Sequence, residues 1–592
     1  HRRKCTERDG SARLEHRSAN GPLTFIPWKL RPCDLFRSKQ LSKMRTTTLL
    51  FISLLSHTAF AQWDIPSVNT PVRAAAGVDA VTPLSAAGRQ GSTYISWFEQ
   101  SDGGYILRMQ RLDVDGVAEW DSEGLLVSEE PQNSALFRYD LAGDLEGNAI
   151  VAFQDERSGS LDVVAYKVGP DGSMVWGSGL ALPTPDGTGL APSIGVLSDN
   201  RVVFAWNTDS SPSAVAYLVV SQDGVPDPAG TQQITSIGNL GRPKIVPCSD
   251  GGFWIQYVEQ DGNFLTPGVI TAARVSATLE LGTPVIVSTK TIAGFYFPQP
   301  ITDGHDGMYV AFNTSNGSNE NITDLFVQRL RADGSLWSPK GTSVEDGVTT
   351  QRFTFSATPA LVNDDDGLML AYQRTDLAQS EGGISVQRMD TAGNRMLSDA
   401  GVVVIPANSL LPAPFGNAAL TDGMVTTTLD VGTGPHKIAA QQIGLDGLVV
   451  GPPISLCSVS SEKDDPTLVP FRNGQAIIAW QDQRSGTGGI YAQPVQLDFN
   501  VGITAPSSTD NTFVLWPNPT TGQLRALLPG EAADLLDLRV IDATGRTIWT
   551  KRRVPFSAEG ILLDLSTLAP GSYALVANTQ KGSLGTSRFI RQ

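Results

Sequence analysis

Short apolar runs alternate with polar turns rich in Gly and Asp along most of the chain. The clearest example spans residues 144–176, where an apolar run at Ala149–Phe153 precedes a polar turn, an alternating run at Val163–Val168 and the pair Asp171–Gly172. Asp-Gly pairs supply the positive φ angles that hairpin turns need. The pattern therefore predicts strand, hairpin, strand, tight turn and a short last strand.

This unit recurs through the chain. Its first apolar run ends on an aromatic residue, replaced by leucine in the seventh copy, and we call these positions the anchors: Trp97, Phe153, Trp206, Tyr257, Phe312, Tyr372, Leu429 and Trp480. A glycine turn follows at a similar distance in six copies, at Gly116, Gly172, Gly224, Gly334, Gly393 and Gly447. Successive anchors are 51 to 60 residues apart, so eight units are visible.

A period of about fifty residues built from short strands is typical of a β-propeller with about four strands per blade. We therefore expect an all-β fold. Residues 62–500 would form a single β-propeller of about eight four-stranded blades, or seven if one unit is degenerate, followed by a small C-terminal antiparallel β-sandwich. A three-stranded β-solenoid or an array of small sandwiches is the alternative, but each would need repeats of a different length.

The start of the repeat region resembles the end of a repeat. Residues Gln62–Ala76 are similar to the repeat tail Glu119–Asn133, and the eighth unit stops at Asp498 without such a tail. We expect the N-terminal segment to supply the missing outer strand of the last blade, which would leave no unpaired joint in the ring.

Residues 44–61 have the organisation of a secretory signal peptide. Met44 is followed by a basic residue and an apolar stretch from Leu49 to Leu55, which is too short to span a bilayer. The small residues Ala59 and Ala61 precede Gln62, and together they form the predicted cleavage site, with Gln62 as the first residue of the mature protein.

Residues 1–43 differ from the rest of the chain. They hold 11 Lys/Arg against 4 Asp/Glu and show no periodicity. We expect translation to start at Met44 and residues 1–43 to be an artefact of gene prediction; a genuine N-terminal extension is the alternative. Without residues 1–45 the chain has 32 Lys/Arg against 56 Asp/Glu, a formal charge of −24. Such an acidic protein is not expected to bind nucleic acid or anionic membranes.

Two cysteines remain after the signal peptide, Cys248 and Cys457. They belong to different repeats, and the sequence does not show whether they pair. Buried free thiols are the preferred interpretation.

A second domain follows the repeats. Residues 501–511 are rich in Pro, Ser, Thr and Asn, which is typical of a linker. Residues 512–592 contain alternating strands separated by turns at Pro519–Gly522, Ala543–Gly545 and Pro570–Gly571. This pattern predicts the compact C-terminal sandwich.

Ordered motifs mark this domain: WPNP at 516–519 with Gly522, DATGR at 542–546, LAPGSY at 568–573 and a basic-apolar end at 588–590. The domain resembles the type A C-terminal sorting domain of type IX secretion substrates from Bacteroidetes. Trp516 stands where the family usually has Tyr, and the end carries fewer lysines than usual. The motif residues are Pro517, Asn518, Pro519, Gly522, Gly545, Gly571 and Tyr573.

The resemblance implies a route. The signal peptide would direct export to the periplasm, the type IX machinery would carry the protein across the outer membrane, and the sorting domain would then be removed. The mature protein would be released or attached to the cell surface. The repeats also resemble uncharacterised secreted proteins that look like propellers, a similarity that implies no activity.

Two nearly identical loops carry an Asp and an Arg two residues apart, at Asp155/Arg157 and Asp482/Arg484. They could grip a polar ligand at the rim, but a turn held by a local ion pair is the preferred interpretation.

Acidic turns at Leu112–Gly116, Asp303–Gly307 and Asn363–Gly367 could offer oxygen ligands to calcium, although none completes the spacing of a calcium loop. Ordinary hairpin turns are preferred, so no cofactor is expected beyond possible calcium. No catalytic, cofactor-binding or metal-binding residues are identified from motifs.

The first functional hypothesis is an exported, monomeric, non-enzymatic propeller that binds a glycan or a protein at the cell surface. The alternative is a secreted carbohydrate-active hydrolase with its site in the central channel of the propeller. Convergent arginines or carboxylates would be the feature that favours the enzyme.

Overall fold

The computed structural model describes residues 63–592 with the exception of short segments. These segments are 133–137, 158–160, 263–265, 293–296, 317–318, 347–352, 357–358, 362–366, 433, 497–513, 528–534, 543–545, 556–559 and 580–581. The predicted cleavage site at Ala59, Ala61 and Gln62, the linker 501–511 and Gly545 of the sorting motif lie outside the described residues.

The regular secondary structure of the described chain is β-strand, as expected, apart from one short 3-10 helix η1 (Arg89–Gly91). The repeats form antiparallel sheets of about four strands in chain order. The first three sheets contain β2 (Ala80–Ala87), β3 (Thr93–Ser101), β4 (Gly104–Leu112) and β5 (Leu125–Gln132); β6 (Asp140–Gly143), β7 (Ala149–Asp155), β8 (Asp162–Val168) and β9 (Leu180–Leu182); and β10 (Gly189–Val196), β11 (Val202–Thr208), β12 (Val215–Val220) and β13 (Gln232–Ile234).

The fourth and fifth sheets contain β14 (Asn239–Pro247), β15 (Phe253–Gln260), β16 (Gly268–Val275) and β17 (Val285–Ile292); and β18 (Gln299–Thr302), β19 (Met308–Asn316), β20 (Asn319–Leu330) and β21 (Thr342–Ser343). A single pair, Ile292 with Thr314, joins these two sheets.

The sixth and seventh sheets contain β22 (Phe353–Ser356) and β23 (Ala360–Leu361), both paired with β24 (Leu368–Thr375), then β25 (Gly382–Met389) and β26 (Val402–Asn408); and β27 (Pro412–Leu420), β28 (Gly423–Asp430), β29 (Ile438–Gly444) and β30 (Val449–Cys457). The eighth contains β31 (Lys463–Arg472), β32 (Gln475–Asp482), β33 (Gly489–Gln496) and the N-terminal strand β1 (Thr70–Arg73).

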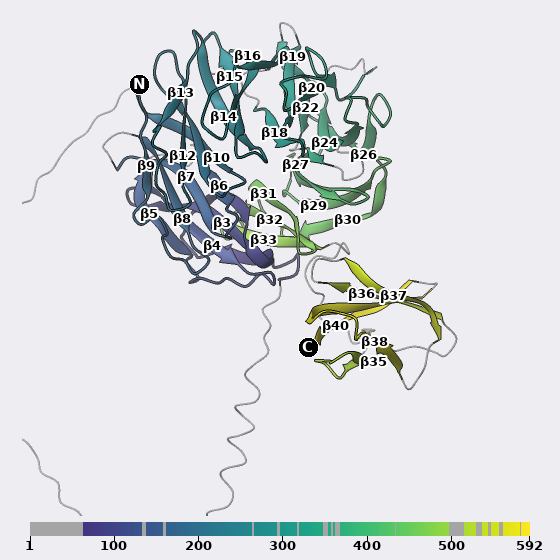
Figure 1. Ribbon diagram of the computed structural model, residues 1–592. Helices are drawn as coiled ribbons and strands as arrows, with labels where there is room; N and C mark the ends of the chain where they lie inside the picture. The colour runs from purple at the N-terminus through teal and green to yellow at the C-terminus, as the bar shows by residue number, and fades with distance from the viewer. Residues whose placement is uncertain are drawn as a thin grey trace, which may run out of the picture. The chain divides into compact units, whose positions relative to one another are not determined.

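The eight sheets form a closed series. β2 contacts β6, β6 contacts β10, and β10 contacts β14, which contacts β18. The series continues as β22 packs on β19 and β20, and β27 packs on β22 and β24. β31 packs on β27 and also on β2, which closes the series. Figure 1 shows the sheets side by side around a common centre, with β6, β10, β14, β18, β27 and β31 toward the inside. We call this arrangement the ring of sheets.

The N-terminal strand closes the ring, as the sequence predicts. β1 pairs with β33, with Thr70 opposite Ala492 and Pro71 opposite Tyr491. Trp63 is buried in one cluster with Trp97 of the first sheet and Ile477 of the eighth. The first and last repeats are therefore joined through a segment from the start of the chain.

All eight anchors are buried on the second strands of their sheets, and none is more than 7% exposed. The aromatic anchors pack against the preceding sheet, as Trp206 does against Ile150 and Trp480 against Val425, whereas Leu429 lies in the cluster shared with the eighth sheet. Large aromatic side chains bury much apolar area, so one aromatic residue per repeat fixes each sheet on its neighbour.

A tryptophan at the end of one repeat packs on the glycine turn of the next. The indole N–H of Trp120 donates to the carbonyl of Pro170, 3.3 Å away, and the indole lies against Gly172. Trp176, Trp337 and Trp63 make the same contact with the turns at Gln222, Thr391 and Val114. These glycines have φ between 78° and 88°, which suits glycine alone among ordinary residues.

The C-terminal unit has two antiparallel sheets. One contains β34 (Val514–Trp516), β35 (Gln523–Leu527) and β38 (Ile561–Asp564), and the other contains β36 (Leu535–Asp542), β37 (Thr547–Pro555), β39 (Gly571–Thr579) and β40 (Gly582–Arg591). Both contribute to one core, with Leu524 and Leu563 from the first sheet and Leu538 and Leu575 from the second.

Cys248 and Cys457 are both buried and both free, so they do not pair. Among the residues that the structure describes, no helix combines the length and the apolar character needed to cross a bilayer.

Candidate ligand-binding site

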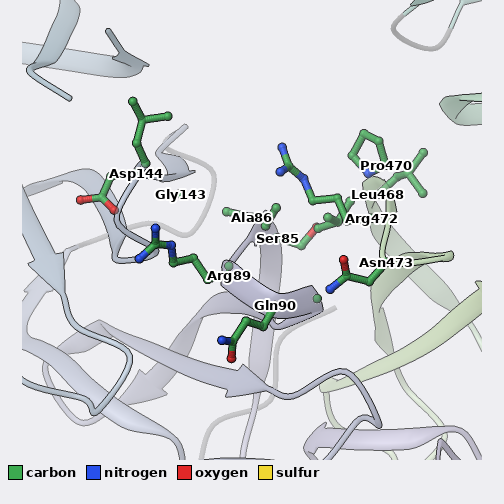
Figure 2. A pocket seen from close by; sticks show the side chains of 15 residues that line it. Ser85, Ala86, Arg89, Gln90, Gly143, Asp144, Leu468, Pro470, Arg472 and Asn473 are labelled. Atoms are coloured by element: carbon green, nitrogen blue, oxygen red, sulfur yellow. The ribbon is translucent and has the colours of Figure 1, made fainter. Parts of the chain in front are cut away.

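A pocket of about 700 Å³ lies where turns between first and second strands meet. It is lined by the β2–β3, β6–β7 and β31–β32 turns of the first, second and eighth sheets, and we call it the turn pocket. Figure 2 shows Arg89 on the side that carries Asp144, with Arg472 and Asn473 coming from the eighth sheet. Arg89 and Arg472 are exposed, so cationic and amide donors face the solvent here.

The carboxylate of Asp144 is engaged within the protein. Its Oδ2 lies 2.9 Å from the ammonium of Lys167, and its Oδ1 accepts the backbone N–H groups of Glu146 and Asn148. Burial alone would raise the pKa of Asp144, but hydrogen bonds from Asn148 and Lys167 lower it below its usual value. Asp144 therefore shapes the wall of the turn pocket and offers little to a ligand.

The opposite ends of the first strands carry a recurrent β-bulge. In β2, β10, β14 and β31 the pairing register shifts at Thr82-Pro83, Ala191-Pro192, Arg242-Pro243 and Asp465-Pro466. The residue before each proline has φ between 47° and 58°. Such angles are uncommon for residues other than glycine, and bulges of this kind re-aim a side chain.

The bulges occupy one position of the repeat, fifteen residues before the anchor of each sheet. Arg138 in the second repeat and Phe297 in the fifth stand at the same spacing. The carbon at the centre of the Arg138 guanidinium lies 3.4 Å from the centroid of the Phe297 ring, and that of Arg242 lies 5.0 Å from the same centroid. We call these three residues the central cluster.

The electrostatics of the central cluster reflect its enclosed position. Arg138 is exposed and Arg242 is half-buried, yet desolvation lowers the pKa of both guanidinium groups, and the charge of Arg138 lowers the pKa of Arg242 further. The two side chains are therefore accessible to solvent, although protein atoms around them reduce their hydration. Two like charges are thus held close together beside one aromatic ring.

Neighbouring sheets hold the bulges in place. The residue after an anchor accepts the bulge N–H of the next sheet: Asn207 Oδ1 accepts from Arg242 at 3.0 Å, and Gln154 Oε1 accepts from Ala191 at 3.1 Å. Gln481 does the same for Thr82 across the closure of the ring. The backbone under the cluster is therefore fixed before any ligand arrives.

Asp465 stands at the bulge position of the eighth sheet. Burial and the charge of Asp464 raise the pKa of Asp465. Its charge also contributes to raising the pKa of Tyr139, which follows Arg138 in the chain, although burial is the main cause of that shift. An acidic group thus stands at the repeat position that Arg242 occupies in the fourth sheet, and its charge reaches the residue next to Arg138.

The predicted Asp/Arg loops are ion pairs with structural partners. Arg157 donates to Asp155, to the hydroxyl of Tyr166 at 2.8 Å and to the carbonyl of Ser178 at 2.9 Å. Arg484 lies 2.6 Å from Asp482 and also donates to the carbonyl of Val68 near the N-terminal strand. The local ion pair, the preferred interpretation, is present in both loops.

The acidic turns use their carboxylates in the same way. Asp113 accepts the N–H groups of Asp115 and Val117, and Asp303 accepts those of His305 and Gly307 and pairs with Arg329 at 2.8 Å. Most of the third turn, at 363–366, lies outside the described residues. In the described parts of the chain no group of three or more His, Cys, Asp or Glu could hold a metal ion, and calcium stays a prediction.

The sorting motif is attached to the last strand. Asn518 Nδ2 donates to the carbonyl of Arg588 at 3.0 Å, while its Oδ1 accepts the N–H of Ile590 at 2.9 Å. Thr520 continues this contact with Ile590 and Gln592. The hydroxyl of Tyr573 donates to the carbonyl of Ala569 at 2.7 Å, and its ring lies against Phe589. Two motifs far apart in sequence thus both contact the C-terminal strand; their roles in sorting stay predictions.

Sequence reasoning missed the central cluster. A partial signal was present, since an X-Pro pair recurs fifteen residues before several anchors and includes Arg242 and Phe297. Arg138 stands at the same spacing but is followed by Tyr139, so no X-Pro pair marks it.

Comparison with known proteins identifies the C-terminal unit. Residues 514–592 match the family described as the secretion system C-terminal sorting domain. This supports the assignment as a type IX secretion substrate, and it means that the protein is exported out of the cell or to its surface. No curated protein sequence matches the chain.

Solved structures show distant similarity. An ulvan lyase from a new family of polysaccharide lyases is 10% identical, with a TM-score of 0.39, over 73% of this chain and 96% of that chain. A protein of unknown function from Dyadobacter fermentans is 10% identical, with a TM-score of 0.32, over 53% and 96%. A puromycin-hydrolysing peptidase from Mycobacterium tuberculosis is 13% identical, with a TM-score of 0.36, over 71% and 60%.

Proposed function

We propose that the eight sheets are the blades of one β-propeller, that the C-terminal sheets form a sandwich, and that the propeller binds a glycan or a protein outside a Bacteroidetes cell. The match of residues 514–592 to a sorting domain supports export. The pairing of β1 with β33 supports a single closed propeller, because no sheet of the series is left without neighbours.

In this proposal the type IX machinery recognises residues 512–592 after the signal peptide has been removed. The sorting domain is then cleaved near 505–511, and the propeller is released or attached to the surface. Binding is favoured over catalysis because the most distinctive group, Arg138 with Arg242, supplies charged donors on a fixed backbone, which suits recognition of a ligand.

The test is intact-mass and terminal peptide analysis of the native protein from culture medium and from washed cells. A product that begins at Gln62 and ends within 505–511 is expected, outside the cell or on its surface. A chain that keeps residues 513–592 and remains inside the cell would overturn the proposal.

The alternative is a carbohydrate-active hydrolase, and Asp465 is the observation in its favour. A general acid needs a raised pKa, and the pKa of Asp465 is raised by burial and by Asp464. Incubation of the purified protein with acidic and neutral polysaccharides, followed by assay of new reducing ends, separates the two. Turnover that Asp465→Asn abolishes would establish the enzyme; an absence of turnover by protein that binds the same polysaccharide would favour the binder.

A further inference from the structure

We propose that Arg138, Arg242 and Phe297 form a binding site for the acid group of an acidic saccharide at the centre of the ring of sheets. The proposal deepens the proposed function and rests on it for the ligand being an extracellular glycan. It does not involve the turn pocket, which lies toward the other end of the first strands.

The position of the cluster follows from the order of the sheets. Arg138 precedes β6 in the second sheet, Arg242 lies in β14 of the fourth, and Phe297 precedes β18 of the fifth. The second and fifth sheets are not neighbours in the closed series, so their side chains meet only across its centre. A ligand held there would lie beside the first strands that carry the bulges.

The chemistry of the cluster suits an oxyanion. The guanidinium of Arg138 lies within van der Waals reach of the Phe297 ring, which orients the group and leaves N–H donors at its edge. Carboxylate and sulfate groups accept such donors in pairs. The two like charges repel each other in the free protein, and a bound anion removes that repulsion.

An acidic residue at the bulge position of the eighth sheet suits a saccharide rather than a bare anion. Asp465 stands at the same repeat position as Arg242, and its carboxyl oxygens can accept hydrogen bonds from hydroxyl groups. A sugar acid presents an oxyanion and several hydroxyls on one rigid frame. Inorganic sulfate could use the arginines alone.

The test measures binding of the secreted mature protein to polygalacturonate, which carries carboxylates, to dextran sulfate, and to neutral dextran. Titration calorimetry and affinity electrophoresis are suitable. Binding of one or both polyanions and no binding of neutral dextran is expected, and comparison of the two polyanions tells whether carboxylate or sulfate is preferred. We expect Arg138→Gln and Arg242→Gln each to weaken binding at least tenfold.

Matched variants separate the site from general charge effects. Arg89→Gln and Arg472→Gln remove the same charge at the turn pocket and should leave affinity unchanged. Arg138→Lys keeps the charge but loses the planar group on Phe297, so a loss close to that of Arg138→Gln is expected, and it provides a second variant if Arg138→Gln fails to fold. Asp465→Asn should weaken polygalacturonate binding severalfold without changing the response of the melting temperature to inorganic sulfate.

Retention of wild-type affinity in the folded double variant Arg138→Gln/Arg242→Gln would overturn the site. A wild-type protein that binds neither polyanion would also overturn it. If that protein still binds a neutral glycan or a protein, the proposed function stands while the present inference fails.

Discussion

At the scale of single residues, four of the six glycine turns lie against an indole. Gly224 has φ of 78°, and a Cβ at this position would lie 2.7 Å from Cδ1 of Trp176. Gly177, beside that tryptophan, has φ of 64° but has nothing within 4 Å of such a Cβ. The two positions therefore separate backbone strain from a steric clash.

We predict that Gly177→Ala destabilises the protein by about 1 kcal/mol, the cost of a left-handed backbone angle. Gly224→Ala should cost about 2–4 kcal/mol, because it adds overpacking against Trp176. Denaturant unfolding of the two variants measures the difference. Equal losses would show that the indole moves away freely.

The buried pair of Asp144 and Lys167 predicts a pH dependence. The two side chains are 0% and 2% exposed. Hydrogen bonds lower the folded pKa of Asp144 despite burial, so its contribution to stability is present above the unfolded value of about 4 and is lost as pH falls through the folded pKa.

Lys167→Met should therefore cost about 3–5 kcal/mol at pH 7, because it leaves a buried carboxylate without its cation. The variant should also lose less stability than the wild type between pH 4 and pH 2, because an unfolded aspartate takes up its proton at about pH 4 and the folded variant no longer holds Asp144 ionised below that pH. Urea unfolding at pH 7 and between pH 4 and pH 2 measures both effects. The double variant Asp144→Asn/Lys167→Met is the control, and it should be more stable than Lys167→Met alone.

Residue by residue, the sequence predicted what every repeat shares. The anchors from Trp97 to Trp480 and the turn glycines were visible because each repeat must bury an aromatic residue and turn tightly. The meeting of Arg138 with Phe297 was not, because it depends on which sheets face each other across the ring.

At the scale of elements, one amide side chain bonds to one edge of the C-terminal strand β40, whose other edge pairs with β39. Asn518 brackets Phe589 as a neighbouring strand would, because its Nδ2 donates to the carbonyl of Arg588 and its Oδ1 accepts the N–H of Ile590. The segment at 518–520 thus completes an edge of the second sheet with a short stretch of non-strand backbone.

We predict that Asn518→Ala destabilises the C-terminal unit by about 1–3 kcal/mol, through the loss of two hydrogen bonds. Asn518→Asp keeps the acceptor and loses only the donor, so its effect should be smaller. Limited proteolysis of residues 512–592 measures stability, and the secreted fraction measures export. Normal proteolysis with impaired export would instead place Asn518 at the recognition surface.

The strands themselves were largely predictable, since apolar alternation and Asp-Gly turns mark their ends. The bulges were not marked by alternation, because a bulge inserts a residue and interrupts the pattern. Arg242-Pro243 reads from sequence as a strand boundary, whereas in the structure β14 continues through it from Asn239 to Pro247.

At the scale of the whole molecule, closure depends on a segment of fewer than fifteen residues. Trp63 and Val72 enter the cluster between the first and eighth sheets, and the side chain of Asn69 is fully buried, with bonds to Leu456 and Gln493. Arg484 adds a bond to the Val68 carbonyl.

We predict that a chain lacking residues 62–76 loses cooperative unfolding and self-associates, because β33 becomes an exposed edge strand and an apolar cluster opens. Size-exclusion chromatography and thermal unfolding measure both effects. A synthetic peptide of residues 62–76 added in trans should restore the monomer, and the same peptide with Trp63→Ala and Asn69→Ala should not. A truncated chain as stable as the full one would contradict the role of β1.

The number of repeats and the closing segment were predicted from spacing and from the likeness of Gln62–Ala76 to a repeat tail. Spacing alone could not place the residues of the central cluster, because they meet only when the complete ring of sheets curves back on itself. This curvature is the sum of small rotations between sheets and has no local signature in the chain.

Because β1 completes the eighth sheet, the point at which the repeat region begins is arbitrary with respect to the folded ring. Moving residues 62–76 to a position after residue 498 would give a circularly permuted chain in which every sheet is contiguous. Such a chain could form its sheets one after another along the sequence. In the native chain, β1 cannot pair until β33 of the last sheet has formed. The native order thus makes the assembled ring a single unit that is complete only when both ends of the repeat region are present.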